Sequence, residues 1–189
     1  MTPNPDRSPG AAPGAARLDA WLRELRLEPV GSAERDGISS RDLVLDGRRR
    51  RGIRLTLILA PDVGLVAWVH YASAPGDGLR RTYRQLLKWN DELPFVKFGL
   101  SADDDVVLSA ELAPAGLDAD ALGRTVARLV AVCDLLQEAS AGFLKSAPGP
   151  AETTNESTAE HAGGGGAAGP TALLERYAPD LAELDPSRT

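Results

Sequence analysis

The chain has 189 residues, of which 43% are hydrophobic and 25% are charged, the balance of an ordinary soluble globular domain. Its formal net charge is -6, and residues 146–189 carry seven acidic side chains against two basic ones, which disfavours affinity of the whole chain for nucleic acid. The single cysteine, Cys133, excludes an intramolecular disulfide, while no apolar run reaches membrane-spanning length and no secretory signal is evident, so a cytoplasmic location is expected.

The N-terminal third predicts one helix followed by strands. Residues 1–15 are mainly Pro, Gly and Ala and are predicted to be disordered. Apolar residues then recur at helical spacing from Leu18 to Leu25, which predicts a short amphipathic helix. The segment 30–40 fits either a short edge strand or a loop, and 42–46 is predicted to be a strand that ends in a glycine turn.

Two longer alternating segments follow and predict a hairpin. Apolar residues occupy every second position of 53–59 and of 65–71, and the turn at 61–64 contains both Pro and Gly. This alternation places Val66 and Trp68 on the face of the sheet opposite to the main apolar face.

A second helix and a second hairpin are predicted after this. Residues 79–93 have one apolar stripe and a basic outer face, and Pro94 cannot continue the helix. The strands 95–100 and 106–112 are joined by an acidic turn.

The longest predicted helix starts at Asp118, a suitable N-cap, and extends to Leu136. Its apolar stripe is wider than one packing partner requires, so we expect a second surface to cover it, either the N-terminal helix or another subunit. The Gly-rich segment 146–169 is predicted to be a flexible linker. The tail 170–189 could form a short helix that docks back on the domain, although a disordered end is the simpler prediction.

The predicted order is therefore α-β-β-β-α-β-β-α over residues 16–145. Runs of strands separated by one helix are typical of an α+β domain in which helices pack mainly on one face of an antiparallel sheet.

Three segments carry a resemblance to a known family: Leu86–Asn90 (LLKWN), Pro94–Phe98 (PFVKF) and Val106–Leu112 (VVLSAEL). Together with the order of elements, they resemble the YbjN family and the wider type III secretion chaperone (CesT-like) fold. The resemblance covers roughly Leu18 to Leu144. It implies a chaperone-like or regulatory module that binds protein, is often dimeric and has no catalytic signature.

The residues give little support to catalysis. His70 lies alone in a predicted strand, Cys133 lies on an apolar helix stripe, and three consecutive acids at 103–105 cannot all face one cation. No phosphate-binding loop, nucleophile elbow or paired metal-ligand spacing is present. We therefore expect no enzyme activity, no cofactor and no metal.

Two binding surfaces are predicted instead. A protein or peptide client, or a second copy in a homodimer, would contact apolar side chains that the fold leaves uncovered, with internal packing of the same residues as the alternative: Leu18, Trp21, Leu25, Val66, Trp68 and Phe98. A nucleic-acid-binding or transcription-related role would use a basic patch, although such residues usually form a solvated surface: Arg48, Arg49, Arg50, Arg51, Arg80, Arg81 and Arg84.

Overall fold

The computed structural model describes residues 13–60, 62–75, 79–142, 144 and 170–184. The predicted disordered segment 1–15 lies mostly outside them, and so does the predicted linker 146–169. Helix α1 (Pro13–Glu24) nevertheless begins before residue 16, because Ala15 already packs into the core.

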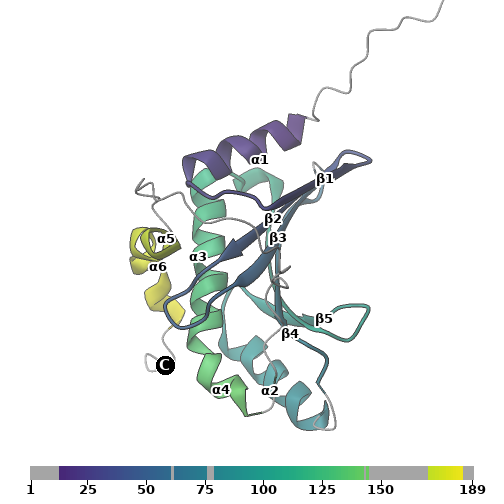
Figure 1. Ribbon diagram of the computed structural model, residues 1–189, viewed down its shortest axis with the longest axis vertical. Coiled ribbons are helices and arrows are strands. Elements are labelled where there is room, and N and C mark those ends of the chain that lie inside the picture. The colour runs from purple at the N-terminus through teal and green to yellow at the C-terminus, as the bar shows by residue number, and fades with distance from the viewer. Residues whose placement is uncertain (1–12, 61, 76–78, 143, 145–169, 185–189) are drawn as a thin grey trace, which may run out of the picture.

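The six strands of the described residues form one antiparallel sheet in the order β1-β2-β3-β4-β6-β5 (Figure 1). The strands are as follows: β1 (Gly31–Arg35), β2 (Ile38–Leu45), β3 (Ile53–Ala60), β4 (Gly64–Ala72), β5 (Lys97–Leu100) and β6 (Val106–Leu112).

The mixed α+β class and the antiparallel sheet are confirmed, with one difference in the order of elements. The ambiguous segment 30–40 contains both β1 and the first part of β2, so four strands precede helix α2 (Leu79–Glu92) rather than three. Asp36 and Gly37 form the intervening turn with positive φ angles of 53° and 80°, which aspartate and glycine tolerate better than most residues.

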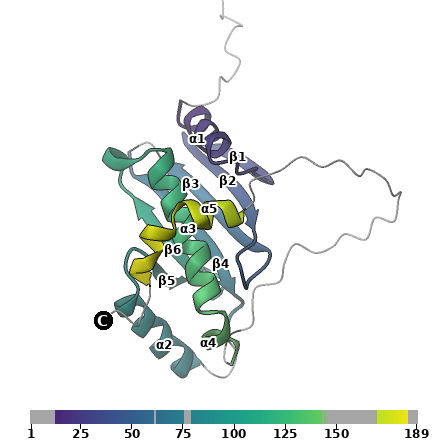
Figure 2. The ribbon, with the colours of Figure 1, turned by 90° about the vertical axis from the view of Figure 1, so that its left-hand side faces the viewer.

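Helix α3 (Ala119–Leu135) crosses one face of the sheet, with α1 beside it and α4 (Gln137–Ala141) after it (Figure 2). The predicted N-cap is confirmed, because the Asp118 carboxylate accepts a hydrogen bond of 2.7 Å from the Ala121 amide. The core lies between this helix and the inward residues of the strands, among which Leu57, Val69 and Leu108 are almost fully buried.

The C-terminal segment forms a third layer. Helix α5 (Pro170–Arg176), helix α6 (Ala178–Leu181) and the 3-10 turn η2 (Ala182–Leu184) lie on the side of α3 that faces away from the sheet (Figures 1 and 2). A further 3-10 turn, η1 (Pro114–Gly116), precedes α3. The prediction of a disordered end is therefore wrong for residues 170–184.

Candidate functional site

Most of the apolar residues predicted to bind a partner are used inside the chain. Leu18, Trp21 and Leu25 are at most 9% exposed, because α1 lays its apolar face against α3 and the strands β2 and β3. Phe98 is also buried, on the helix-covered face of the sheet, where its ring lies 5.2 Å from Tyr71 and 5.5 Å from Trp89. These four side chains therefore do not form an exposed seam.

Val66 and Trp68 lie on the other face of the sheet, as the alternation predicts. Both are half-buried, and the Trp68 ring stacks on His70 with a centroid separation of 5.5 Å. Ile38 and Val44 on strand β2, which β3 separates from β4, are exposed. No helix of the described residues covers this face in Figure 1.

The arginines of the β2–β3 loop do not act as one basic patch. Arg50 is buried: its guanidinium lies 4.6 Å from the centroid of the Tyr71 ring and donates to the Tyr71 carbonyl. Arg49 and Arg51 are exposed and form ion pairs with Glu138 at 3.5 Å and with Asp46 at 3.2 Å. Arg80, Arg81 and Arg84 are exposed on the separate helix α2.

Asp134, which was not among the predicted site residues, fixes this loop through hydrogen bonds. One carboxylate oxygen accepts the Arg48 amide at 2.6 Å, and the other accepts the Arg49 and Arg50 amides at 2.9 Å each. Gly47 is needed at the same place, because a Cβ there would collide with the carboxylate. The sequence feature that could have indicated this contact is an aspartate within the apolar C-terminal half of a predicted helix, because a buried carboxylate requires hydrogen-bond donors.

The tail docks on α3 through apolar side chains. Leu173, Leu174, Tyr177 and Leu184 are each buried to 6% exposure or less. Gly123 allows the close approach, because a Cβ at this position would collide with the Tyr177 hydroxyl and lie 2.7 Å from a methyl carbon of Leu25. A glycine inside a long helix was the sequence signal for this contact, since glycine lowers helix stability unless packing requires it.

Charged groups surround this apolar contact. The Tyr177 hydroxyl donates to Asp120 at 3.0 Å, and the guanidinium of Arg124 pairs with Asp120. Further pairs join the tail to α3: Arg176 with Asp120 at 3.7 Å, Arg124 with Asp180 at 3.7 Å and Arg128 with Glu183 at 3.4 Å.

These contacts shift two pKa values in opposite directions. The hydrogen bond from Tyr177, followed by the nearby Arg124, lowers the pKa of Asp120 below its ordinary value. Burial, together with the hydrogen bond to the Asp120 carboxylate, raises the pKa of Tyr177 to about 12. The docked state therefore favours an ionised Asp120 beside a neutral Tyr177.

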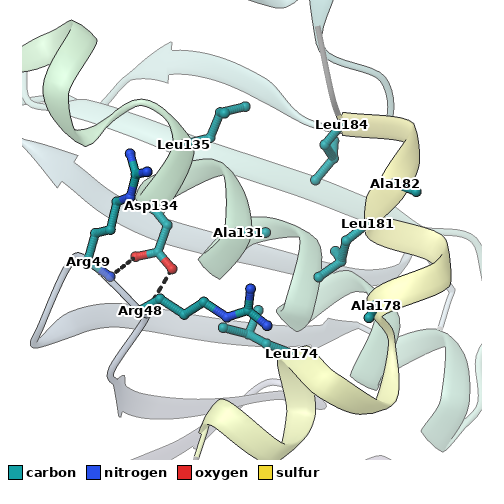
Figure 3. A pocket seen from close by; sticks show the side chains of 10 residues that line it. All are labelled: Arg48, Arg49, Ala131, Asp134, Leu135, Leu174, Ala178, Leu181, Ala182 and Leu184. Carbon is teal, nitrogen blue, oxygen red and sulfur yellow. Dashed lines mark hydrogen bonds between the residues drawn. The ribbon is translucent and has the colours of Figure 1, made fainter. Parts of the chain in front are cut away.

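A cavity of about 450 Å³ opens where the tail meets the domain (Figure 3). The β2–β3 loop and α3 supply one wall, and α5, α6 and η2 supply the other (Figure 3). Its lining combines apolar side chains with two arginines and one aspartate: Arg48, Arg49, Ala131, Asp134, Leu135, Leu174, Ala178, Leu181, Ala182 and Leu184.

Other kinds of site receive no support from the described part of the chain. It contains no cluster of three His, Cys, Asp or Glu side chains that could hold a metal. None of its helices is both long enough and apolar enough to cross a bilayer. The Cys133 thiol is fully buried, and burial raises its pKa to about 12, so it is not a poised nucleophile.

Comparison with known proteins identifies the domain. No curated protein matches the chain. The YbjN family, which is described as "Putative bacterial sensory transduction regulator", matches residues 15–141, about two-thirds of the chain. The match ends at α4, so the docked tail lies outside it. From this match over most of its length, the chain belongs to the YbjN family.

Proposed function

We propose that this protein is a non-enzymatic regulatory module with a chaperone-like mode of action, which binds a protein or peptide on the outer face of α3. The observation that carries the proposal is the tail: an amphipathic segment from outside the matched domain occupies this face. A helix face that receives such a segment from its own chain has the shape and chemistry to receive one from another protein.

The chemistry of the contact describes the expected partner. The α3 face offers apolar contacts around Gly123 and two arginines, Arg124 and Arg128, at its border. The tail meets them with leucines, a tyrosine and the acids Asp180 and Glu183. A client would therefore present a short amphipathic helix with leucine or aromatic anchors and acidic flanks.

Competition between tail and client would give regulation. The tail is covalently joined to the domain through residues 145–169, so it competes at an effective concentration on the order of millimolar. Helix α5 has seven residues, too few for a stable isolated helix, so its folding depends on docking. A client that binds α3 would displace and unfold the tail.

The test uses the full chain and a fluorescent peptide with the sequence of residues 170–184. The double variant Leu173→Asp/Leu174→Asp should release the tail and bind the peptide at least about 100-fold more tightly than the unsubstituted protein does, as measured by fluorescence anisotropy. Leu87→Asp is the matched control, because Leu87 is 69% exposed on α2. Equal affinity for all three proteins would contradict the proposal.

A second copy of the chain is the other partner we propose, and it would bind on the uncovered face of the sheet. Half-buried Trp68 and Val66, together with exposed Ile38 and Val44, support it. Light scattering should then give a dimer mass that Trp68→Lys reduces to the monomer mass. A monomer at all concentrations in the unsubstituted protein would remove this part of the proposal.

Nucleic-acid binding is the alternative function. What favours it is the exposed row of Arg80, Arg81 and Arg84 on α2, with Tyr83 beside it. Titration with single- and double-stranded oligonucleotides at low salt separates the two functions. Saturable binding that Arg81→Glu/Arg84→Glu abolishes would favour the alternative, whereas no binding would remove it.

A further inference from the structure

We propose that the cavity between the tail and the domain is a binding site for a small amphipathic carboxylate, an aliphatic chain with one anionic head. The aliphatic chain would lie on the leucine and alanine side chains, and the head would meet the guanidinium group of Arg48. The regulatory consequence drawn below rests on the proposed function, but the binding site itself does not.

The size and the lining fit such a ligand. A volume of about 450 Å³ is within the range of small-molecule sites. Seven aliphatic side chains from α3 and the tail line the two walls of the cavity, and Leu135 among them remains 38% exposed (Figure 3). An aliphatic chain placed there would remove this apolar surface from water.

The polar end favours an anion. Arg48 extends along the cavity beside Leu174 in Figure 3, and no described residue forms an ion pair with its guanidinium. Arg49 is paired with Glu138 at 3.5 Å, and its guanidinium points away from that of Arg48 in Figure 3. A carboxylate head beside the Arg48 guanidinium would gain charge-assisted hydrogen bonds.

Asp134 also borders the cavity, and its charge has to be weighed against that of an anionic ligand. Both of its oxygens already accept backbone amides of the loop, and the residue is only 8% exposed. Arg48 and Arg49 also line the cavity, whereas the Arg50 guanidinium lies on the Tyr71 ring. Because Arg49 is paired with Glu138, the Arg48 guanidinium is the group that remains for an anion, and a cationic head would meet it unfavourably.

Binding in this cavity would be coupled to the position of the tail. Five of the lining residues belong to the domain and five to the tail. A ligand that contacts both walls binds only the docked state well, so it stabilises docking by mass action. Under the proposed function, the ligand would therefore close the α3 face to clients.

The binding test uses decanoate as the probe, below its micelle concentration, with the full-length protein and isothermal titration calorimetry. Decanoate should bind saturably at one site, whereas acetate, which lacks the chain, and decyltrimethylammonium, which has the opposite charge, should bind at least tenfold more weakly. Arg48→Gln should weaken decanoate binding about tenfold or more, because it removes a charged hydrogen-bond donor. Arg81→Gln, an exposed arginine on α2, is the matched control and should bind like the unsubstituted protein.

Besides an absence of decanoate binding, two results would overturn the site: equal binding of decanoate and decyltrimethylammonium, or unchanged decanoate affinity in both Arg48→Gln and Leu135→Gln. The coupling between ligand binding and docking of the tail is measured separately, as the rate of amide hydrogen exchange of residues 170–184. Saturating decanoate should slow this exchange. Decanoate binding without slower exchange would overturn the coupling. Absence of decanoate binding would overturn the site alone, since peptide competition for α3 is measured without any ligand.

Discussion

At the scale of single residues, the side chain of Asp134 in α3 fixes the conformation of the β2–β3 loop that borders the cavity. Its carboxylate is the acceptor for three consecutive backbone amides, which would otherwise be partly buried without partners. Arg50, the last of the three residues, is held by this contact in the position where its guanidinium covers Tyr71.

We therefore expect Asp134→Ala to lower the free energy of unfolding by about 2–4 kcal/mol, since each buried donor left without an acceptor costs ~1–3 kcal/mol. Asp91→Ala, an exposed aspartate on α2, should cost less than about 0.5 kcal/mol. Urea denaturation followed by circular dichroism measures both. Equal free energies of unfolding for the two variants would show that water molecules replace the carboxylate as the acceptor for the three amides.

Tyr177 and Asp120 give tail docking a defined dependence on pH. The pKa of Asp120 is lower in the docked state, so its contribution is complete above the ordinary value of 3.8 and is lost as the pH falls below it. The pKa of Tyr177 rises from 10.0 to about 12, so its contribution is complete below pH 10 and is lost as the pH rises from 10 to 12. Docking should therefore be constant from about pH 5 to pH 9 and weaken on both sides.

A nitroxide label on Glu175→Cys can measure this docking, because Glu175 is exposed and Cys133 is buried. The label should become mobile below pH 4 and above pH 10, and Tyr177→Phe should remove the alkaline release. Circular dichroism is needed alongside, because burial also raises the pKa of Tyr71 to about 12. A label that is equally mobile at pH 7 and pH 11 would contradict the assigned role of Tyr177.

At the scale of elements, the docking of the tail depends on the small size of one residue in α3. Gly123→Ala should favour an isolated helix by about 1 kcal/mol. In the protein, however, the added methyl group would collide with Tyr177 and press on Leu25, which directly follows α1. We therefore expect this variant to release the tail and to make the label at position 175 mobile at neutral pH.

The matched control for this prediction is Gly142→Ala, since no described residue other than its chain neighbours has an atom within 4 Å of a Cβ at that position. It should leave the label as immobile as in the unsubstituted protein. If Gly123→Ala also left the label immobile, α3 and the tail would have enough freedom to separate slightly, and the contact would be looser than the packing indicates.

The end of helix α2 shows which contacts the LLKWN segment makes in the structure. Asn90 lies at the end of the LLKWN segment, where its side-chain amide donates to the Phe98 carbonyl at 3.0 Å and its oxygen accepts the Phe98 amide at 2.6 Å. Lys97 donates to the Asn90 carbonyl at 2.6 Å. The helix end and the edge strand β5 are thus joined by the residues that carried the family resemblance.

At the scale of the whole molecule, Cys133 reports on cooperative unfolding. The thiol is completely buried among the core residues of α3, and its pKa is about 12. We expect iodoacetamide at pH 8 to modify native protein only when the whole domain unfolds. Because the unfolded fraction is small, native protein should be modified roughly 10³-fold or more slowly than unfolded protein. Fast modification that is unaffected by stabilising salts would show local opening of α3 instead.

The fold could be read largely from periodicity and turn residues. The alternation in β3, β4 and β6 predicted their faces, because a half-buried strand must alternate, and Asp118 predicted the start of α3. Strand β1 and the first part of β2 were harder: β1 is almost entirely exposed, so burial leaves no alternation in its sequence.

The candidate site was much less predictable. An amphipathic stripe such as that of α1 or α3 says that a surface will be covered but not by which segment, because the pattern is the same for an internal and an external partner. Leu18, Trp21 and Leu25 are covered by other parts of the same chain, and the tail covers the apolar surface of α3 that faces away from the sheet.

By itself, the sequence determined the fold class, the family and the position of most elements, because local periodicity, capping and turn chemistry depend only on neighbouring residues. The tertiary structure alone decided that Asp134 organises the arginine loop and that Tyr177 meets Asp120 across Gly123. These contacts join residues that are tens of positions apart, so the internal Gly123 and the buried Asp134 indicate that a partner exists but not which segment supplies it.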